Sequence, residues 1–147
     1  MKTRMSINNA EPKIYKVMDK ADELVVSFEI EPGLKELVKL RASQINGCGY
    51  CVNYHSKEAR KLGETEQRLY AVSAWWETPF FTEEEQAIFE FTEEVTCISN
   101  GGVSDETFNK VLKILGEQKT AQLIFIIVTT NSWNRLAIST HMIAEED

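Results

Sequence analysis

Residues 32–63 decide how this chain folds, and they read PGLKELVKLRASQINGCGYCVNYHSKEARKLG. Pro32 suits the first turn of a helix, because backbone N–H groups in that turn have no helical partner and the N–H that proline lacks is therefore not missed there. Apolar residues then follow at helical spacing as far as Gly47, which comes after an asparagine and is typical of a turn. A second helix is predicted to begin near Cys48 and to end at Gly63, a residue common just beyond helices. The stretch therefore predicts a helical hairpin.

The rest of the chain also follows helical spacing. Outside the hairpin, helices are predicted over about 11–28, 69–78, 82–100, 104–115 and 118–143. The last of these contains LIFIIVTT, residues 123–130, whose β-branched residues are more typical of a strand. No partner strand is evident elsewhere, and a lone strand would leave its backbone groups unpaired. We therefore expect a buried helix there, and an all-α fold in a single domain over residues 1–147.

Composition narrows the class of protein. The chain has 147 residues, of which 43% are hydrophobic and 27% are charged, as in ordinary globular domains. Its net charge of -7 argues against a sequence-independent nucleic-acid surface, which would need a basic face. The sequence has no Lys/Arg-rich tract, no secretory signal and no apolar run long enough to span a membrane. Three cysteines are too few for a disulfide-stapled secreted fold, so we expect a protein of the reducing cytoplasm.

Two cysteines and a histidine lie on one face of the second helix of the hairpin. Cys48, Cys51 and His55 occupy positions i, i+3 and i+7, and an i,i+3 pair places the Cα atoms about 5 Å apart, which suits a disulfide. Thiols at a helix N-terminus are stabilised as thiolates by the helix dipole. His55, one turn beyond Cys51, can take its proton.

Such a cluster can also serve as a metal site, a haem attachment site or a thioredoxin-type motif. Structural zinc needs four ligands, and the remaining candidates, Cys97 and His141, have no ligand-like spacing. Covalent haem attachment needs a histidine directly after the second cysteine, where this chain has Val52. A thioredoxin-type motif would lie between a strand and a helix, and no strand is expected in this chain. A redox-active dithiol without metal or cofactor is the leading hypothesis, and zinc and an inert structural pair remain alternatives.

Glu36 adds a possible partner for the histidine. In an antiparallel hairpin that turns at Gly47, a carboxylate at position 36 comes within about one helical turn of His55. Apolar residues flank Glu36, and a charge close to a core requires a reason. We expect Glu36 to act on His55 directly or through water, the alternative being an ordinary solvated charge.

Two segments carry a resemblance to a known family. ELVKLRASQINGCGYCVNYHSKEARKLGETEQRLYAVSAWWETPFFTEEEQ, residues 36–86, resembles the AhpD-like alkylhydroperoxidases of the carboxymuconolactone decarboxylase family. That group has a glutamate twelve residues before the first cysteine, then CxxC, and a histidine four residues further on. NSWNRLAIS, residues 131–139, is similar to the C-terminal helix of the same group. The resemblance implies an all-α fold without metal or haem, usually assembled as a trimer or hexamer.

The resemblance also implies roles for the residues. Cys51 would be oxidised by a hydroperoxide and Cys48 would resolve it to a disulfide, with His55 and Glu36 as the proton relay. We expect Cys48 to be within reach of an external reductant. One departure concerns Tyr50, a secondary candidate, which stands where the best-studied members have a second histidine.

The expected partners are a hydroperoxide substrate and a dithiol electron donor, which the resemblance suggests to be a lipoyl protein or a peroxiredoxin. A homo-oligomer is expected, because the Trp75-Trp76 pair and residues 123–128 are more apolar than a small monomer needs. Two other functions remain open: a redox-sensing or scaffold oligomer that does not turn over, and a lactone decarboxylase of the same family.

Overall fold

The computed structural model describes residues 2–144 and 146, and these residues form helices but no strand. The elements in chain order are α1 (Ile7–Ala10), α2 (Pro12–Ser27), α3 (Pro32–Asn46), α4 (Gly49–Lys61), α5 (Glu66–Ala71), the 3₁₀ helix η1 (Val72–Glu77), α6 (Glu83–Thr96) and α7 (Asp105–Thr140). The predicted all-α class is confirmed, and the strand-like residues 123–130 are helical. None of the helices in the described part of the chain has the length and apolar character needed to cross a membrane.

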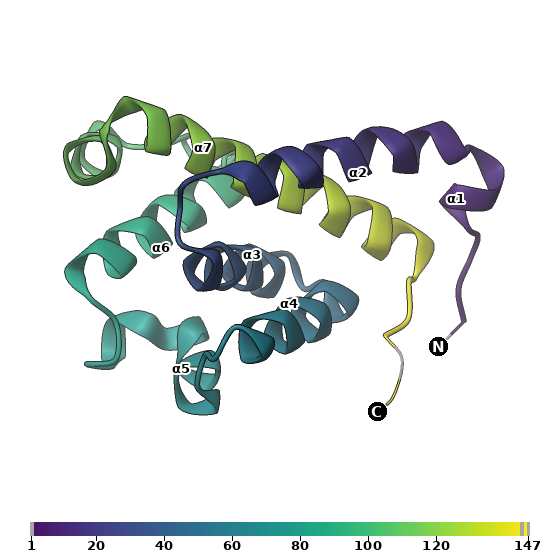
Figure 1. The fold of residues 1–147 in the computed structure, drawn as a ribbon, viewed down its shortest axis with the longest axis horizontal. Coiled ribbons are helices and arrows are strands. Elements are labelled where there is room, and N and C mark those ends of the chain that lie inside the picture. The colour runs from purple at the N-terminus through teal and green to yellow at the C-terminus, as the bar shows by residue number, and fades with distance from the viewer. Residues whose placement is uncertain (1, 145, 147) are drawn as a thin grey trace.

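The hairpin forms as its punctuation predicts. The side chain of Glu31 caps α3 by accepting hydrogen bonds from the backbone N–H groups of Gly33 and Leu34, at 2.9 Å and 2.6 Å. Gly47 follows α3 with a φ of 70°, a left-handed conformation that glycine adopts without a steric penalty. The chain then reverses, and α4 runs back alongside α3 (Figure 1). This reversal brings the start of α4 close to the end of α3.

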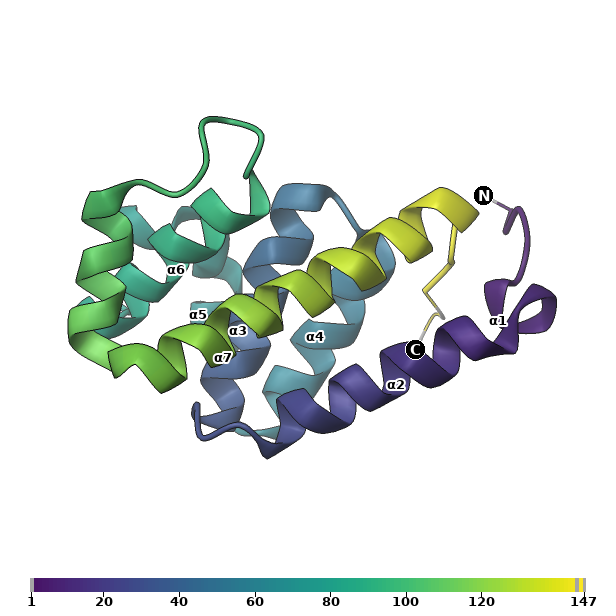
Figure 2. The same cartoon turned by 90° about the horizontal axis from the view of Figure 1, so that it is seen from above.

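Helix α3 is the centre of the molecule. It packs against α4, α6 and α7, and its buried side chains contribute to two apolar clusters. The larger cluster joins α2, α3, α6 and α7; its largest fully buried members are Val25, Val38, Ile88, Phe91, Val111, Leu123, Ile126 and Ile127. Much of the apolar segment 123–128 is therefore buried in the core of this chain. Figures 1 and 2 show α2 and α7 crossing over the hairpin.

Helix α7 bends sharply at Gly116. Two separate helices were predicted on either side of this glycine, and the structure joins them in one element with a kink. Gly116 has a φ of 75° and a ψ of 170°, a combination that essentially only glycine adopts. The kink directs the second half of α7 back across α3 (Figure 2).

A buried lysine fixes the end of α2 against α3. The ammonium group of Lys35 donates hydrogen bonds to the backbone carbonyls of Val25, Val26 and Phe28, at 3.0–3.1 Å. Carbonyls at a helix C-terminus have no helical partner, so a cation there is stabilising. Burial lowers the pKa of Lys35, and the positive charge of Lys39 lowers it further. The contact holds α2 in place above the hairpin.

Candidate active site

The two cysteines of the motif lie at the beginning of α4 and are joined by a disulfide, with their Cα atoms 5.3 Å apart. Cys48 is the N-cap residue, and its sulfur accepts a hydrogen bond from the backbone N–H of Cys51 at 3.3 Å. Both side chains are buried, with 1% of Cys48 and 4% of Cys51 exposed. Ala137 and Met142, from the end of α7 and the residues after it, pack against the pair.

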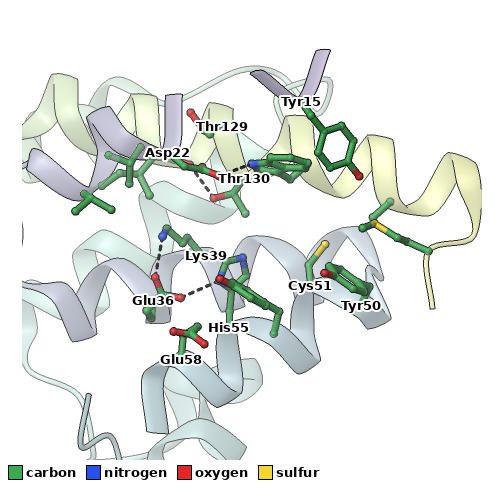
Figure 3. A pocket seen from close by; sticks show the side chains of 17 residues that line it. Tyr15, Asp22, Glu36, Lys39, Tyr50, Cys51, His55, Glu58, Thr129 and Thr130 are labelled. Carbon is green, nitrogen blue, oxygen red and sulfur yellow. Dashed lines mark hydrogen bonds and ion pairs between the residues drawn. The ribbon is translucent and has the colours of Figure 1, made fainter. Parts of the chain in front are cut away.

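A cavity of about 420 Å³ opens beside Cys51. It is bounded by α2, α3, α4 and α7, and Figure 3 shows the side chains that line it. Cys51 is among the lining residues and Cys48 is not. The expectation that an external reductant reaches Cys48 is therefore wrong for this conformation, because the sulfur that faces the cavity belongs to Cys51.

His55 and Glu36 are in direct contact. His55 lies one turn after Cys51 on the same face of α4, and its Nδ1 is 2.8 Å from Oε2 of Glu36. The side chains are 13% and 11% exposed, so the contact is shielded from water. When Nδ1–H donates to the carboxylate, the other ring nitrogen carries the lone pair and can accept a proton.

Glu36 is held ionised by two neighbours. Its other oxygen, Oε1, accepts a hydrogen bond from the ammonium group of Lys39 at 2.7 Å. Burial alone would raise the pKa of the Glu36 carboxyl, but the hydrogen bond from His55 and the charge of Lys39 outweigh it and lower that pKa. A carboxylate that stays charged can stabilise a protonated His55.

Aromatic side chains form much of the cavity wall. The rings of Tyr50 and Tyr54 are stacked with centroids 6.5 Å apart, and those of Tyr54 and His55 meet edge to face with centroids 5.2 Å apart. From the opposite side, Tyr15 of α2 contacts Trp133 of α7 edge-on at 5.2 Å. Tyr50, the secondary candidate, lines the same cavity as Cys51.

Several polar or aromatic residues of the cavity were not predicted, among them Tyr15, Asp22, Lys39 and Trp133. Asp22 accepts a hydrogen bond from the indole N–H of Trp133 at 2.9 Å, which ties α2 to α7. Trp133 belongs to the NSWNRLAIS segment, and Lys39 follows Glu36 by one helical turn, so these two carried a sequence signal. Tyr15 and Asp22 carried none, because α2 reaches the cavity only through tertiary packing.

Within residues 2–144 and 146, no group of three or more His, Cys, Asp or Glu side chains is arranged to hold a metal ion. Cys97, one of the candidates weighed for zinc, is a free thiol at the C-cap of α6, and it is not among the cavity-lining residues.

Comparison with known proteins identifies the family. The model of the carboxymuconolactone decarboxylase family matches residues 12–94, which is more than half of the chain. The chain belongs to this family. It is 38% identical over 139 residues to the uncharacterized protein YdfG of Bacillus subtilis, covering 95% of each chain. It is also 30% identical over 102 residues to the uncharacterized protein YnjA of Escherichia coli, covering 69% of this chain and 56% of that protein.

Solved structures share the fold. A crystal structure from Agrobacterium tumefaciens, of a protein of unknown function described as a candidate antioxidant defence protein AhpD, superimposes with a TM-score of 0.97 at 33% identity and covers 99% of this chain and 100% of that one. The debrominase Bmp8 superimposes with a TM-score of 0.84 at 20% identity, covering 93% of this chain and 74% of that one, which shows the fold alone. The AhpD-like resemblance seen in the sequence is confirmed.

Proposed function

We propose that this protein is a thiol-dependent peroxidase that reduces organic hydroperoxides at Cys51 and is regenerated by an external dithiol. The observation that carries the proposal is that three groups line one cavity: a cysteine sulfur at a helix N-terminus, a histidine one turn away and a carboxylate 2.8 Å from that histidine. Membership of the carboxymuconolactone decarboxylase family supports a peroxidase-type function at the level of the family.

The chemistry starts from the reduced protein. His55 takes the proton of Cys51, and Glu36 stabilises the imidazolium that results. The thiolate attacks the terminal oxygen of the hydroperoxide, so that the O–O bond breaks and Cys51 becomes a sulfenic acid. The alkoxide that leaves takes the proton back from His55 and departs as an alcohol.

Cys48 then completes the cycle. Its sulfur attacks the sulfenic acid of Cys51, water leaves, and the disulfide forms between the two residues. As N-cap of α4, Cys48 is well placed to be a thiolate, which makes it a good leaving group when the disulfide is reduced. Because Cys51 faces the cavity, the donor's first thiolate attacks Cys51 and releases Cys48. The second thiol of the donor then displaces Cys51 and leaves as a disulfide.

Consumption of a hydroperoxide by the purified protein, with several small dithiols as donors, tests the proposal. We expect many turnovers per chain, loss of activity in Cys51→Ser and full activity in Cys97→Ser, the matched control. A single stoichiometric oxidation would instead support a redox sensor. Since one protein of this fold is a debrominase, a brominated aromatic compound is included; debromination without peroxide reduction would overturn the proposal.

We also propose that the chain forms a homo-oligomer. Val17, Leu24 and Val26 of α2 are 67%, 48% and 74% exposed, and Trp76 is 54% exposed. Exposed apolar side chains of this size favour an interface between copies. Light scattering at micromolar concentration should give a multiple of the 16.8 kDa chain mass, and a stable monomer would contradict this proposal.

A further inference from the structure

The cavity beside Cys51 carries more negative than positive charge. Asp22, Glu36 and Glu58 line it, and the lysine among its lining residues is Lys39. The ammonium group of Lys39 is already paired with the carboxylate of Glu36 at 2.7 Å, so the positive charge of Lys39 is largely neutralised by Glu36. Glu58 is paired with Lys61, whose side chain is 70% exposed and is not among the cavity-lining residues.

Asp22 is the carboxylate whose charge is least compensated by a direct contact. Its hydrogen bond comes from the neutral indole of Trp133, at 2.9 Å, and not from a cation. Burial raises the pKa of Asp22 above its ordinary value, and the hydrogen bond from Trp133 and the charges of Lys39 and His55 offset only part of this rise. In Figure 3, Asp22 lies across the cavity from the Glu36 and His55 pair, so negative groups face the cavity from two sides.

The remaining wall is aromatic and apolar. Tyr15, Tyr50, Tyr54 and Trp133 supply flat surfaces, and Met142 lies beside the disulfide. A volume of about 420 Å³ is of the size that holds a small organic molecule, such as a substituted benzene. Such walls stabilise uncharged groups by removing their apolar surface from water.

We propose that this cavity selects hydroperoxides with an uncharged organic group and rejects those whose organic group carries a carboxylate, with Asp22 as the specificity-determining residue. The proposal rests on the proposed peroxidase function and adds the substrate class. A carboxylate that enters the cavity loses its hydration and is repelled by the negative charges of the wall. The ammonium group of Lys39 does not offset this cost, because it is already paired with Glu36. An ester or alkyl group of similar size meets no such penalty.

The test compares two aryl hydroperoxides that differ in one group. Cumene hydroperoxide bearing a para methyl ester and the same compound bearing a para carboxylate have equal peroxide chemistry and similar size. We expect kcat/KM to be about tenfold or more lower for the carboxylate, a modest effect for like charges a few ångströms apart at the edge of a protein interior. High salt should narrow the difference.

Asp22→Asn should raise kcat/KM for the carboxylate several-fold relative to kcat/KM for the ester. Asparagine keeps an oxygen that can accept the hydrogen bond from Trp133, and thermal unfolding checks that the fold is retained. Glu23→Gln is the matched control: Glu23 is exposed on the same helix, does not line the cavity, and its loss removes the same charge. Equal kcat/KM for the two substrates in the wild type, or a ratio that Asp22→Asn leaves unchanged, would overturn the proposal.

Binding separates this proposal from the peroxidase function itself. The two cumyl alcohols, which correspond to the two substrates but lack the peroxide bond, are added while iodoacetamide alkylates Cys51 in the reduced protein. The ester should protect Cys51 at lower concentration than the carboxylate, even if no hydroperoxide is reduced. Equal protection by the two alcohols would refute charge selection whatever the result of the turnover assay.

Discussion

Replacing Glu36 by glutamine tests the proton relay most sharply, because it keeps the shape of the side chain and removes its charge. The carboxylate lies 2.8 Å from Nδ1 of His55 in a largely buried contact. A hydrogen bond to a charged group contributes about 1.5–3 kcal/mol, and each 1.4 kcal/mol is a factor of ten. Oxidation of Cys51 should therefore slow by roughly tenfold to 150-fold. This range overlaps the roughly 10²–10⁴ that general acid–base groups supply.

The assay measures sulfenic acid on Cys51 with a dimedone-type reagent, in a Cys48→Ser background where no disulfide can form. Glu90→Gln serves as the control, since Glu90 pairs with Lys110 at 2.9 Å on the surface and does not line the cavity. It should keep the rate of the parent protein. A Glu36→Gln protein that folds normally and is oxidised at the parent rate would refute the relay and make Glu36 a structural charge.

Three further predictions concern stability. Gly116→Ala should lower the free energy of unfolding by about 1–3 kcal/mol, because alanine is strained at a φ of 75° and a ψ of 170°; an unchanged urea midpoint would contradict this. Lys35→Met should cost about 2–4 kcal/mol, because the carbonyls of Val26 and Phe28 lose the donor that Lys35 supplies and the carbonyl of Val25 keeps only the backbone N–H of Phe28; a loss below 0.5 kcal/mol in urea unfolding would show that water replaces the ammonium group. Burial opposes ionisation of Glu85, but the hydrogen bonds from Arg68 and Thr82 and the charge of Arg68 together outweigh it and lower the pKa of Glu85 below 4.5. The stabilisation that ionised Glu85 gives the folded state is therefore fully present above pH 4.5 and is lost as the pH falls through the lower pKa of the folded state. Glu85→Gln should lower the free energy of unfolding by about 1–2 kcal/mol at pH 7 and have little effect near pH 2. An equal loss at both pH values would contradict this.

The sequence was most informative where structure is decided locally. Pro32 and Gly47 define the ends of α3 because each acts on its own backbone, and the hairpin follows from them. The contact between Glu36 and His55 could be expected because a short turn fixes which residues of two antiparallel helices meet. The structure makes this contact direct, with no bridging water needed.

The sequence was least informative where distant segments meet. The short helix α1 was missed, because four residues give no periodic signal. Asp22 and Tyr15 reach the cavity because α2 packs against α7 and crosses over the hairpin, a placement that depends on the whole core. The burial of Cys48 depends on Ala137 and Met142, almost ninety residues further along the chain, and no local pattern indicates it.

The central claim is that Cys51 is the sulfur that a hydroperoxide oxidises and that Cys48 resolves it. The most direct test challenges reduced Cys48→Ser and Cys51→Ser proteins with one equivalent of hydroperoxide, traps sulfenic acid with a dimedone-type reagent and maps the label by mass spectrometry. The account predicts rapid and persistent labelling of Cys51 in Cys48→Ser, and no rapid labelling of Cys48 in Cys51→Ser. Label on Cys48 in Cys51→Ser, formed as fast as label on Cys51 in Cys48→Ser, would contradict it.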